Sequence, residues 1–158
     1  MRTWVDASAI IALDAVGEVD MLRDLLERVA ITRQVAEEVF AGRESLALRN
    51  ARGTWIDVVD VGGDLRPLAS LGLGKGEASL LLTPAADRLV LDEIPARTVA
   101  EAEGREYVGL LGLLLAGVDR GAIPADRARE VLHKLAQGSF RMTADLYDGV
   151  LRALDERG

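Results

Sequence analysis

Two aspartates stand directly after short apolar segments of the chain, where a carboxylate contributes nothing to a hydrophobic core. Asp6 follows the first apolar residues of "TWVDASAIIAL", and Asp92 ends "RLVLD". If both segments are strands of one parallel sheet, their carboxyl ends lie at the same edge, where ligands bind in open α/β sheets. We therefore expect Asp6 and Asp92 to face a common site, although an aspartate after a strand also serves as a turn or cap residue.

Two glutamates occupy helical positions from which they could reach the same edge. In "VAEEVF", Glu38 comes three residues after Val35 and lies close to the buried stripe, whereas Glu37 is better placed for solvent. Glu77 falls in the first turn of the helix that opens after "GLGKG", where a glutamate can also simply complement the helix dipole. The sequence thus offers four candidate acids for one site.

Four acids at one site need a positively charged partner, and the nature of that partner decides which reaction the site could catalyse. Four carboxylates without cations would repel one another and raise one another's pKa. Mg²⁺ and Mn²⁺ prefer oxygen ligands, and such ions can hold a phosphate, lower the pKa of a bound water and stabilise a leaving oxygen. The chain has no cysteine, and its one histidine, His133, is expected on the surface of a late helix. These residues favour metal-assisted phosphodiester hydrolysis.

Alternating strand-like and helix-like segments supply the framework for these acids. Strands are predicted at 2–6, Ala30–Ile31, 54–61, 88–92 and 106–110. Helices are predicted at 9–15 after a Ser8 cap, within 18–30, at 33–40 after a Thr32 cap, and at 43–52, 75–86, 94–104, 111–120, 124–137 and 143–157, with a loop at 62–67. This order predicts a three-layer α/β/α fold in which the first strand is central to a parallel sheet of four to five strands, in a single domain over 1–158.

Composition narrows the class of protein. At 158 residues and 49% hydrophobic, the chain can build a full core. Its most apolar run, 109–118, is about half of what a membrane span needs, so we expect a soluble, cytoplasmic protein. The net charge of −7 argues against a static basic surface for nucleic acid. It does not argue against a nucleic acid that is cut and released.

Several enzyme classes with similar elements fit poorly. A haloacid-dehalogenase phosphatase needs a second aspartate two residues after the first, and this chain has Ser8 there. A receiver domain needs an acidic pair near its first strand and a lysine after a late strand, which Lys75 and Lys134 do not supply. The segment "GLGKGE" is not a P-loop, since Ala69 stands where the first glycine should be, and no strand directly precedes it as in a Rossmann fingerprint.

The order of motifs resembles that of a PIN-domain protein, nearly from end to end. The chain reads "VDAS", "VAEEVF", "GKGEASLLL", "LVLDEIPAR" and "YVGLLGLLLAGVDRGAIP", and the tail "GSFRMTADLYDGVLRALDE" is similar to the last helix of one subgroup. That subgroup comprises PIN-like predicted nucleic-acid-binding proteins related to VapC-type ribonuclease toxins. Two departures stand out. Thr32 and Arg33 precede the "V-x-x-E" helix where the family often has proline, and Leu91 replaces a hydroxyl-bearing or small residue.

The resemblance implies a site and an activity. It assigns catalytic and metal-binding roles to Asp6, Glu38, Glu77 and Asp92, and substrate contacts to Ser8 and Arg97, which follows in the pattern "D-E-x-x-x-R" with Glu93. The expected activity is a Mg²⁺- or Mn²⁺-dependent endoribonuclease, and its narrower form is a toxin-type ribonuclease with an antitoxin partner. The alternative is a non-catalytic PIN-fold module that binds RNA or protein.

Two further expectations concern partners. The chain has more apolar surface than one small domain needs to bury, in the run 109–118 and on the apolar faces of 20–29 and 145–154. This surplus predicts a homodimer, and the family resemblance also favours one. Four arginines are candidate phosphate contacts; they are Arg33, Arg43, Arg97 and Arg105.

Overall fold

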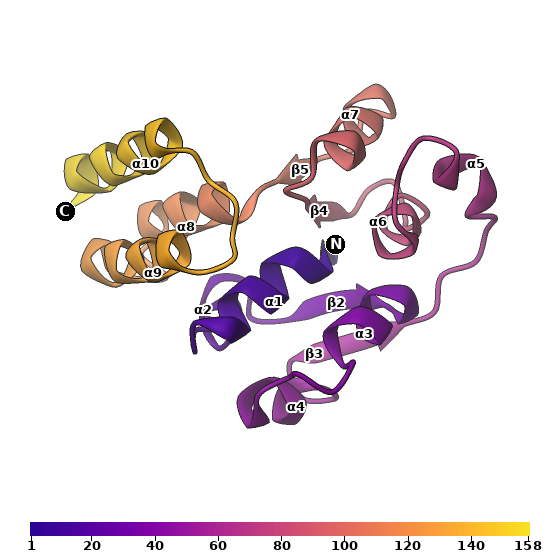
Figure 1. The fold of residues 1–158 in the computed structure, drawn as a ribbon, viewed down its shortest axis with the longest axis horizontal. Coiled ribbons are helices and arrows are strands. Elements are labelled where there is room, and N and C mark those ends of the chain that lie inside the picture. Colours follow the sequence, from indigo (N-terminus) through magenta and orange to yellow (C-terminus); the bar gives the residue numbers. More distant parts are fainter.

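The computed structural model, which describes residues 1–158, is built on five parallel strands in the order β3-β2-β1-β4-β5 (Figure 1). Their bounds are Thr3–Val5 (β1), Val29–Thr32 (β2), Ile56–Val59 (β3), Arg88–Val90 (β4) and Tyr107–Val108 (β5). Successive side chains of a strand point to opposite faces, and all four residues of β2 are buried. Both faces of the sheet are therefore covered, which confirms the predicted three-layer α/β/α fold with β1 at its centre.

Ten helices cover the sheet. They are α1 (Ala7–Ala15), α2 (Met21–Leu26), α3 (Arg33–Val39), α4 (Leu46–Ala51), α5 (Arg66–Ala69), α6 (Lys75–Leu80), α7 (Ile94–Ala102), α8 (Leu110–Asp119), α9 (Ala125–Gln137) and α10 (Ala144–Arg157). Helix α3 packs against both α1 and α6, and α8 packs against α9 and α10. Figure 1 shows α8, α9 and α10 gathered together on the side of the molecule away from α5 and α6.

Several element boundaries differ from the sequence prediction, each for a local reason. Helix α1 begins at Ala7, because the side chain of Asp6 rather than that of Ser8 caps it. The predicted helix 18–30 is helical only over Met21–Leu26, since Glu27 adopts φ 63° and turns the chain into β2. The predicted helix 75–86 ends at Leu80, after which the backbone forms successive turns. The predicted loop at 62–67 overlaps the start of α5 at Arg66.

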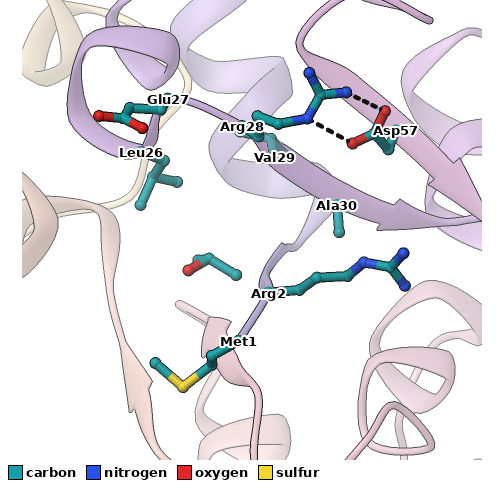
Figure 2. Close-up of a pocket in the computed structure, with 9 residues that line it drawn as sticks. Met1, Arg2, Leu26, Glu27, Arg28, Val29, Ala30 and Asp57 are labelled. Atoms are coloured by element: carbon teal, nitrogen blue, oxygen red, sulfur yellow. Dashed lines mark hydrogen bonds and ion pairs between the residues drawn. The ribbon is translucent and has the colours of Figure 1, made fainter.

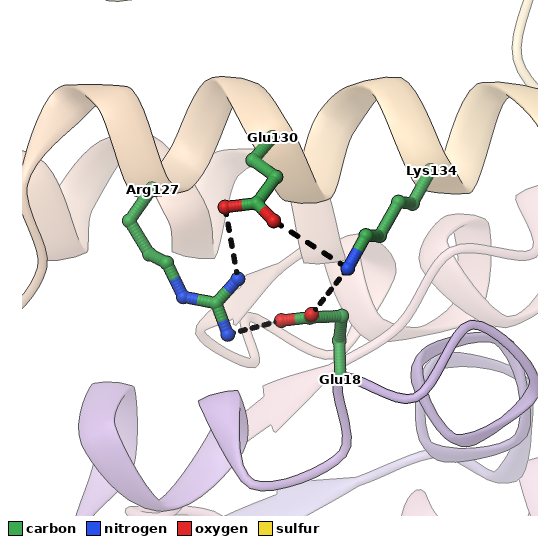
Figure 3. A network of polar contacts seen from close by, with 4 residues as sticks. All are labelled: Glu18, Arg127, Glu130 and Lys134. Atoms are coloured by element: carbon green, nitrogen blue, oxygen red, sulfur yellow. Dashed lines mark hydrogen bonds and ion pairs between the residues drawn. The ribbon is translucent and has the colours of Figure 1, made fainter.

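One ion-pair network joins buried Glu18, which follows α1, to partly exposed residues of α9 (Figure 3). The carboxylate of Glu18 pairs with Arg127 and, at 2.8 Å, with Nζ of Lys134, and Glu130 completes the network. Burial raises the pKa of Glu18, but hydrogen bonds from Arg127 and Lys134 outweigh it and hold that pKa below its ordinary value. The network fixes α9 against the rest of the domain.

The apolar segments that suggested a dimer are used within the chain. Residues Leu110, Leu113 and Leu114 of α8 are fully buried, as are Leu22 of α2 and Leu154 of α10. Their side chains belong to one cluster of 41 buried hydrophobic residues. Much of this apolar surface is therefore covered within the chain, while Leu146 of α10 is 47% exposed, and the homodimer stays a prediction. No helix of the structure combines the length and the apolar character that crossing a bilayer requires.

Candidate active site

The sheet order places the two strand-end aspartates beside each other. Strands β1 and β4 are hydrogen-bonded neighbours, with Val5 in register with Val90. The backbone N–H of Asp6 continues the ladder by donating to the carbonyl of Val90 at 3.1 Å. Asp92 comes two residues after the end of β4, so both aspartates lie at the carboxyl edge of the sheet, as the sequence predicts.

Asp6 is the most deeply buried of the four acids, with 4% of its surface exposed. Its Oδ1 accepts a hydrogen bond from the N–H of Ala7 at 2.7 Å, and the Oγ of Ser8 lies 3.5 Å from Oδ2. Burial, and to a smaller extent the charges of Glu77, Glu38 and Asp92, raise the pKa of Asp6 to about 7, against the lowering effect of the Ala7 N–H. The four acids therefore share one electrostatic environment around Asp6.

Glu38 reaches this environment from α3, across the first turn of α6. Its side chain is exposed, yet its Oε1 lies so close to α6 that a Cβ added to Gly76 would come within 2.7 Å of it. A larger residue at position 76 would therefore displace the flexible Glu38 carboxylate. Glu37, the neighbouring acid, lines a separate hollow with Arg33, Phe40 and Arg52, as expected from its position on the helix.

Glu77 serves the helix on which it lies. Its carboxylate accepts from the backbone N–H of Gly74 at 3.4 Å, which caps the start of α6. Burial raises the pKa of Glu77 despite this hydrogen bond, and the charges of Glu93 and Glu38 add to the effect. Glu77 thus both stabilises the start of α6, where the sequence suggests that it complements the helix dipole, and contributes to the acidic cluster.

Asp92 is oriented from two sides. Its Oδ1 and Oδ2 accept from the N–H of Leu110 at 3.2 and 3.4 Å, at the start of α8, and Nη2 of Arg97 lies 3.6 Å from Oδ1. Burial still raises the pKa of Asp92, although these two partners lower it. A Cβ at Gly109 would come within 2.7 Å of Oδ1 and closer still to Arg97, so this glycine makes room for the pair.

The four carboxylates provide oxygen ligands of the kind that a hard divalent cation prefers. Three of the four carboxyls have raised pKa values, and a cation would relieve both their burial and their mutual repulsion. In this structure, however, the carboxylates of Asp6, Glu77 and Asp92 are turned toward backbone N–H groups. No three histidine, cysteine, aspartate or glutamate side chains are arranged closely enough to hold a metal ion. The residues fit the ion, whereas their present side-chain directions do not yet form its coordination sphere.

Comparison with known proteins identifies the family of the chain. The family model DUF3368, described as a PIN domain, matches residues 3–156. The chain belongs to this PIN-domain family. No curated protein and no solved structure matches the chain. PIN domains are commonly nucleases and typically use divalent metals, which is consistent with acids at the carboxyl edge of the sheet.

One acid of this PIN domain that sequence reasoning left outside the candidate set takes part in the cluster. The charge of Glu93 raises the pKa of both Glu77 and Asp92. The available signal was its position directly after Asp92, in the pattern "D-E-x-x-x-R". Sequence reasoning could not, by contrast, identify Gly76 and Gly109 as the residues that leave room for the carboxylates.

The arginines expected to contact phosphate are engaged to different degrees in the PIN domain. Arg105 is buried, and its guanidinium donates to the carbonyls of Leu81, Thr83, Pro84 and Asp87 and to the hydroxyl of Thr83, so it has a structural role instead. Arg33 lies 3.6 Å from Asp60 in an exposed ion pair, and Arg43 is exposed. Arg97 donates to the carbonyl of Leu91 and stacks over Tyr107, with 37% of its side chain exposed.

One pocket of the PIN domain lies away from the acids. It has a volume of about 410 Å³ and is lined by residues at the amino ends of β1, β2 and β3, including Arg2, Glu27 and Arg28. Figure 2 shows Arg28 forming a two-pronged ion pair with Asp57 beside it. Because the strands are parallel, this pocket opens at the edge opposite to Asp6.

Proposed function

We propose that this PIN domain is a metal-dependent endoribonuclease that hydrolyses RNA phosphodiester bonds with Asp6, Glu38, Glu77 and Asp92. The observation that carries the proposal is the raised pKa of Asp6, which reaches about 7 through burial and through the charges of the other three acids. A fold that buries a carboxylate among carboxylates is destabilised by doing so, unless a cation compensates the charge. The choice of RNA as substrate rests on the family resemblance.

The residues have distinct roles in this proposal. Mg²⁺ or Mn²⁺, when bound, would supply a water of lowered pKa and stabilise the leaving oxygen. Asp6 and Asp92 are the fixed ligands, since backbone N–H groups of Ala7 and Leu110 hold them in place. Glu38 and Glu77 have fewer contacts and would be free to turn toward a bound ion.

Two neighbours of the fixed ligands would contact the substrate phosphate. Ser8 lies beside Asp6 with its hydroxyl 3.5 Å from Oδ2. Arg97 lies beside Asp92, and its partly exposed guanidinium can reach solvent as well as the carboxylate. With only 4% aromatic residues in the chain, binding of RNA through a platform of stacked bases is not expected.

The toxin reading is the narrower form of this proposal. In that form the domain would be a VapC-type ribonuclease that works as a homodimer and is held inactive by an antitoxin protein. The gene beside this one would be the most direct test for an antitoxin. Light scattering at micromolar concentration tests the dimer, and a mass of 17.0 kDa, that of one chain, would count against it.

A second candidate function has one specific observation in its favour. The carboxylates of Asp6, Glu77 and Asp92 accept hydrogen bonds from backbone N–H groups. No three acids are close enough together to hold a metal ion. A non-catalytic module that binds RNA or protein would keep such a cluster for structural purposes, with Asp6 capping α1 and Glu77 capping α6. This reading predicts that the protein leaves RNA intact whether or not Mn²⁺ is present.

Cleavage and metal binding measured on the same samples separate the two functions. The proposal predicts slow cleavage of single-stranded RNA with Mg²⁺ or Mn²⁺ and none with EDTA. Asp6→Asn should reduce the rate by orders of magnitude, because it removes one charge from the metal site. Glu37→Gln is the matched control on α3, one residue from Glu38 but in a different hollow. Equal, EDTA-sensitive activity in both variants would show that these acids are not the site.

A further inference from the structure

Two buried hydroxyl groups join the helices that carry Glu38 and Glu77. Oγ1 of Thr32, at the N-cap of α3, lies 2.7 Å from Oγ of Ser79 in α6, and neither residue has any exposed surface. The two residues are 47 positions apart in the sequence. A polar contact so deeply buried is favourable only while both partners are satisfied.

The hydrogen bonds at both ends fix the direction of this contact. Oγ1 of Thr32 accepts from the N–H of Val35 at 3.1 Å, and the hydroxyl of Ser79 donates to the carbonyl of Gly76 at 2.6 Å. A serine hydroxyl has a single proton, so Thr32 must be the donor in its contact with Ser79. An unbroken chain therefore runs from the first turn of α3 to the first turn of α6.

This series of hydrogen bonds ends at the carbonyl of Gly76, which lies next to both acids. Gly76 is the residue over which Oε1 of Glu38 lies, and Glu77 follows it directly. Helices α3 and α6 have seven and six residues, and helices this short depend on tertiary contacts for their stability and placement. The hydroxyl pair is a buried hydrogen bond between their side chains.

We propose that Thr32 and Ser79 are positioning residues that hold α3 against α6 at the separation in which Glu38 and Glu77 can bind one cation with Asp6. The inference rests on the proposed function, since it concerns the metal site of the same acids. Neither hydroxyl touches the ion or the substrate. Loss of either would let the two short helices shift, and the carboxylates would then meet the cation in fewer of the molecules.

Mn²⁺ affinity, measured by calorimetry without RNA, tests this pair. Ser79→Ala and Thr32→Val should each weaken Mn²⁺ binding by about tenfold or more, as removal of residues that orient metal ligands commonly does. Thr32→Ser keeps the hydroxyl and should restore nearly wild-type affinity. The double variant should bind about as weakly as either single variant, because one contact is lost in all three. If Thr32→Val fails to fold, Ser79→Ala, which removes a single oxygen, carries the test.

A matched control separates positioning from general destabilisation. Thr83 is a buried threonine whose hydroxyl donates to the carbonyl of Leu80 and accepts from Arg105, away from both acids. Thr83→Val should lower the melting temperature but leave Mn²⁺ affinity unchanged. If Ser79→Ala and Thr83→Val affect melting and affinity alike, the positioning role is refuted while the metal site stands. If the wild type itself binds no Mn²⁺, the proposed function fails and the positioning role fails with it.

Discussion

Replacing Asp6 with asparagine should make the metal-free protein more stable, and should do so in a pH-dependent way. Asp6 is almost completely buried, and its carboxylate is destabilised by that burial and by three other acids. Asparagine has nearly the same size and caps helices as well as aspartate does, so the hydrogen bond from the N–H of Ala7 can be kept. The substitution therefore removes the unfavourable charge and little else.

The magnitude follows from the difference between the folded and unfolded pKa of Asp6. Its pKa is raised from 3.8 to about 7 on folding, which at about 1.4 kcal/mol per pH unit corresponds to about 4 kcal/mol of destabilisation. Because the folded state binds the proton more tightly, the destabilisation is absent below pH 3.8, grows as the pH rises, and is complete above pH 7. Asp6→Asn should thus gain up to about 4 kcal/mol at pH 8 and little at pH 4.

Urea denaturation in EDTA at pH 4, 6 and 8 measures this gain directly. Mn²⁺ at about one hundred times its dissociation constant should add about 2.7 kcal/mol to the wild type alone and so narrow the gap at pH 8. Glu37→Gln, an exposed change on α3, is the control and should alter stability little at any pH. An equal effect of Asp6→Asn at pH 4 and pH 8, or a loss of stability at pH 8, would refute the reasoning.

Three other substitutions test features of the fold and the site. Gly76→Ala should leave thermal stability unchanged or slightly higher, as alanine suits a helix better, yet weaken Mn²⁺ binding several-fold by calorimetry, because the new Cβ displaces the Glu38 carboxylate. Arg105→Ala should cost about 2–4 kcal/mol in urea denaturation, since it strands the buried carbonyls of 81–87. Glu18→Gln should cost about 1–2 kcal/mol at pH 7 by the same measurement. That difference should shrink as the pH falls below 4.5, because a carboxylate with a lowered pKa stabilises the fold only while it is ionised.

The predictable part of the fold rests on local patterns. The apolar segments before Asp6 and Asp92 identify two strands, and the rule that parallel strands share a carboxyl edge places both acids correctly. Thr32 caps α3 as its position before "RQVAEEV" indicates. These features depend on a few neighbouring residues, so the sequence expresses them directly.

The features that escaped prediction are long-range. Arg105 is of the residue type that contacts phosphate, but the turns at 81–87 surround its guanidinium with carbonyl oxygens. The pairing of Thr32 with Ser79 joins positions with no pattern between them. The apolar stretch 109–118 looked like interface surface because its covering helix α10 lies far along the chain. In each case the residue's role depends on a neighbour that only the tertiary packing brings next to it.

The central position of β1 has a consequence for how the protein is made. The first strand leaves the ribosome at once, but Thr3 lies beside Arg88, a partner 85 residues later. At about 5–20 residues per second, synthesis takes several seconds or more to supply β4 and then the N–H of Leu110 that orients Asp92. Until then the acidic cluster has no complete set of elements to hold it. A nascent or prematurely terminated chain that stops before Leu110 would therefore lack the site.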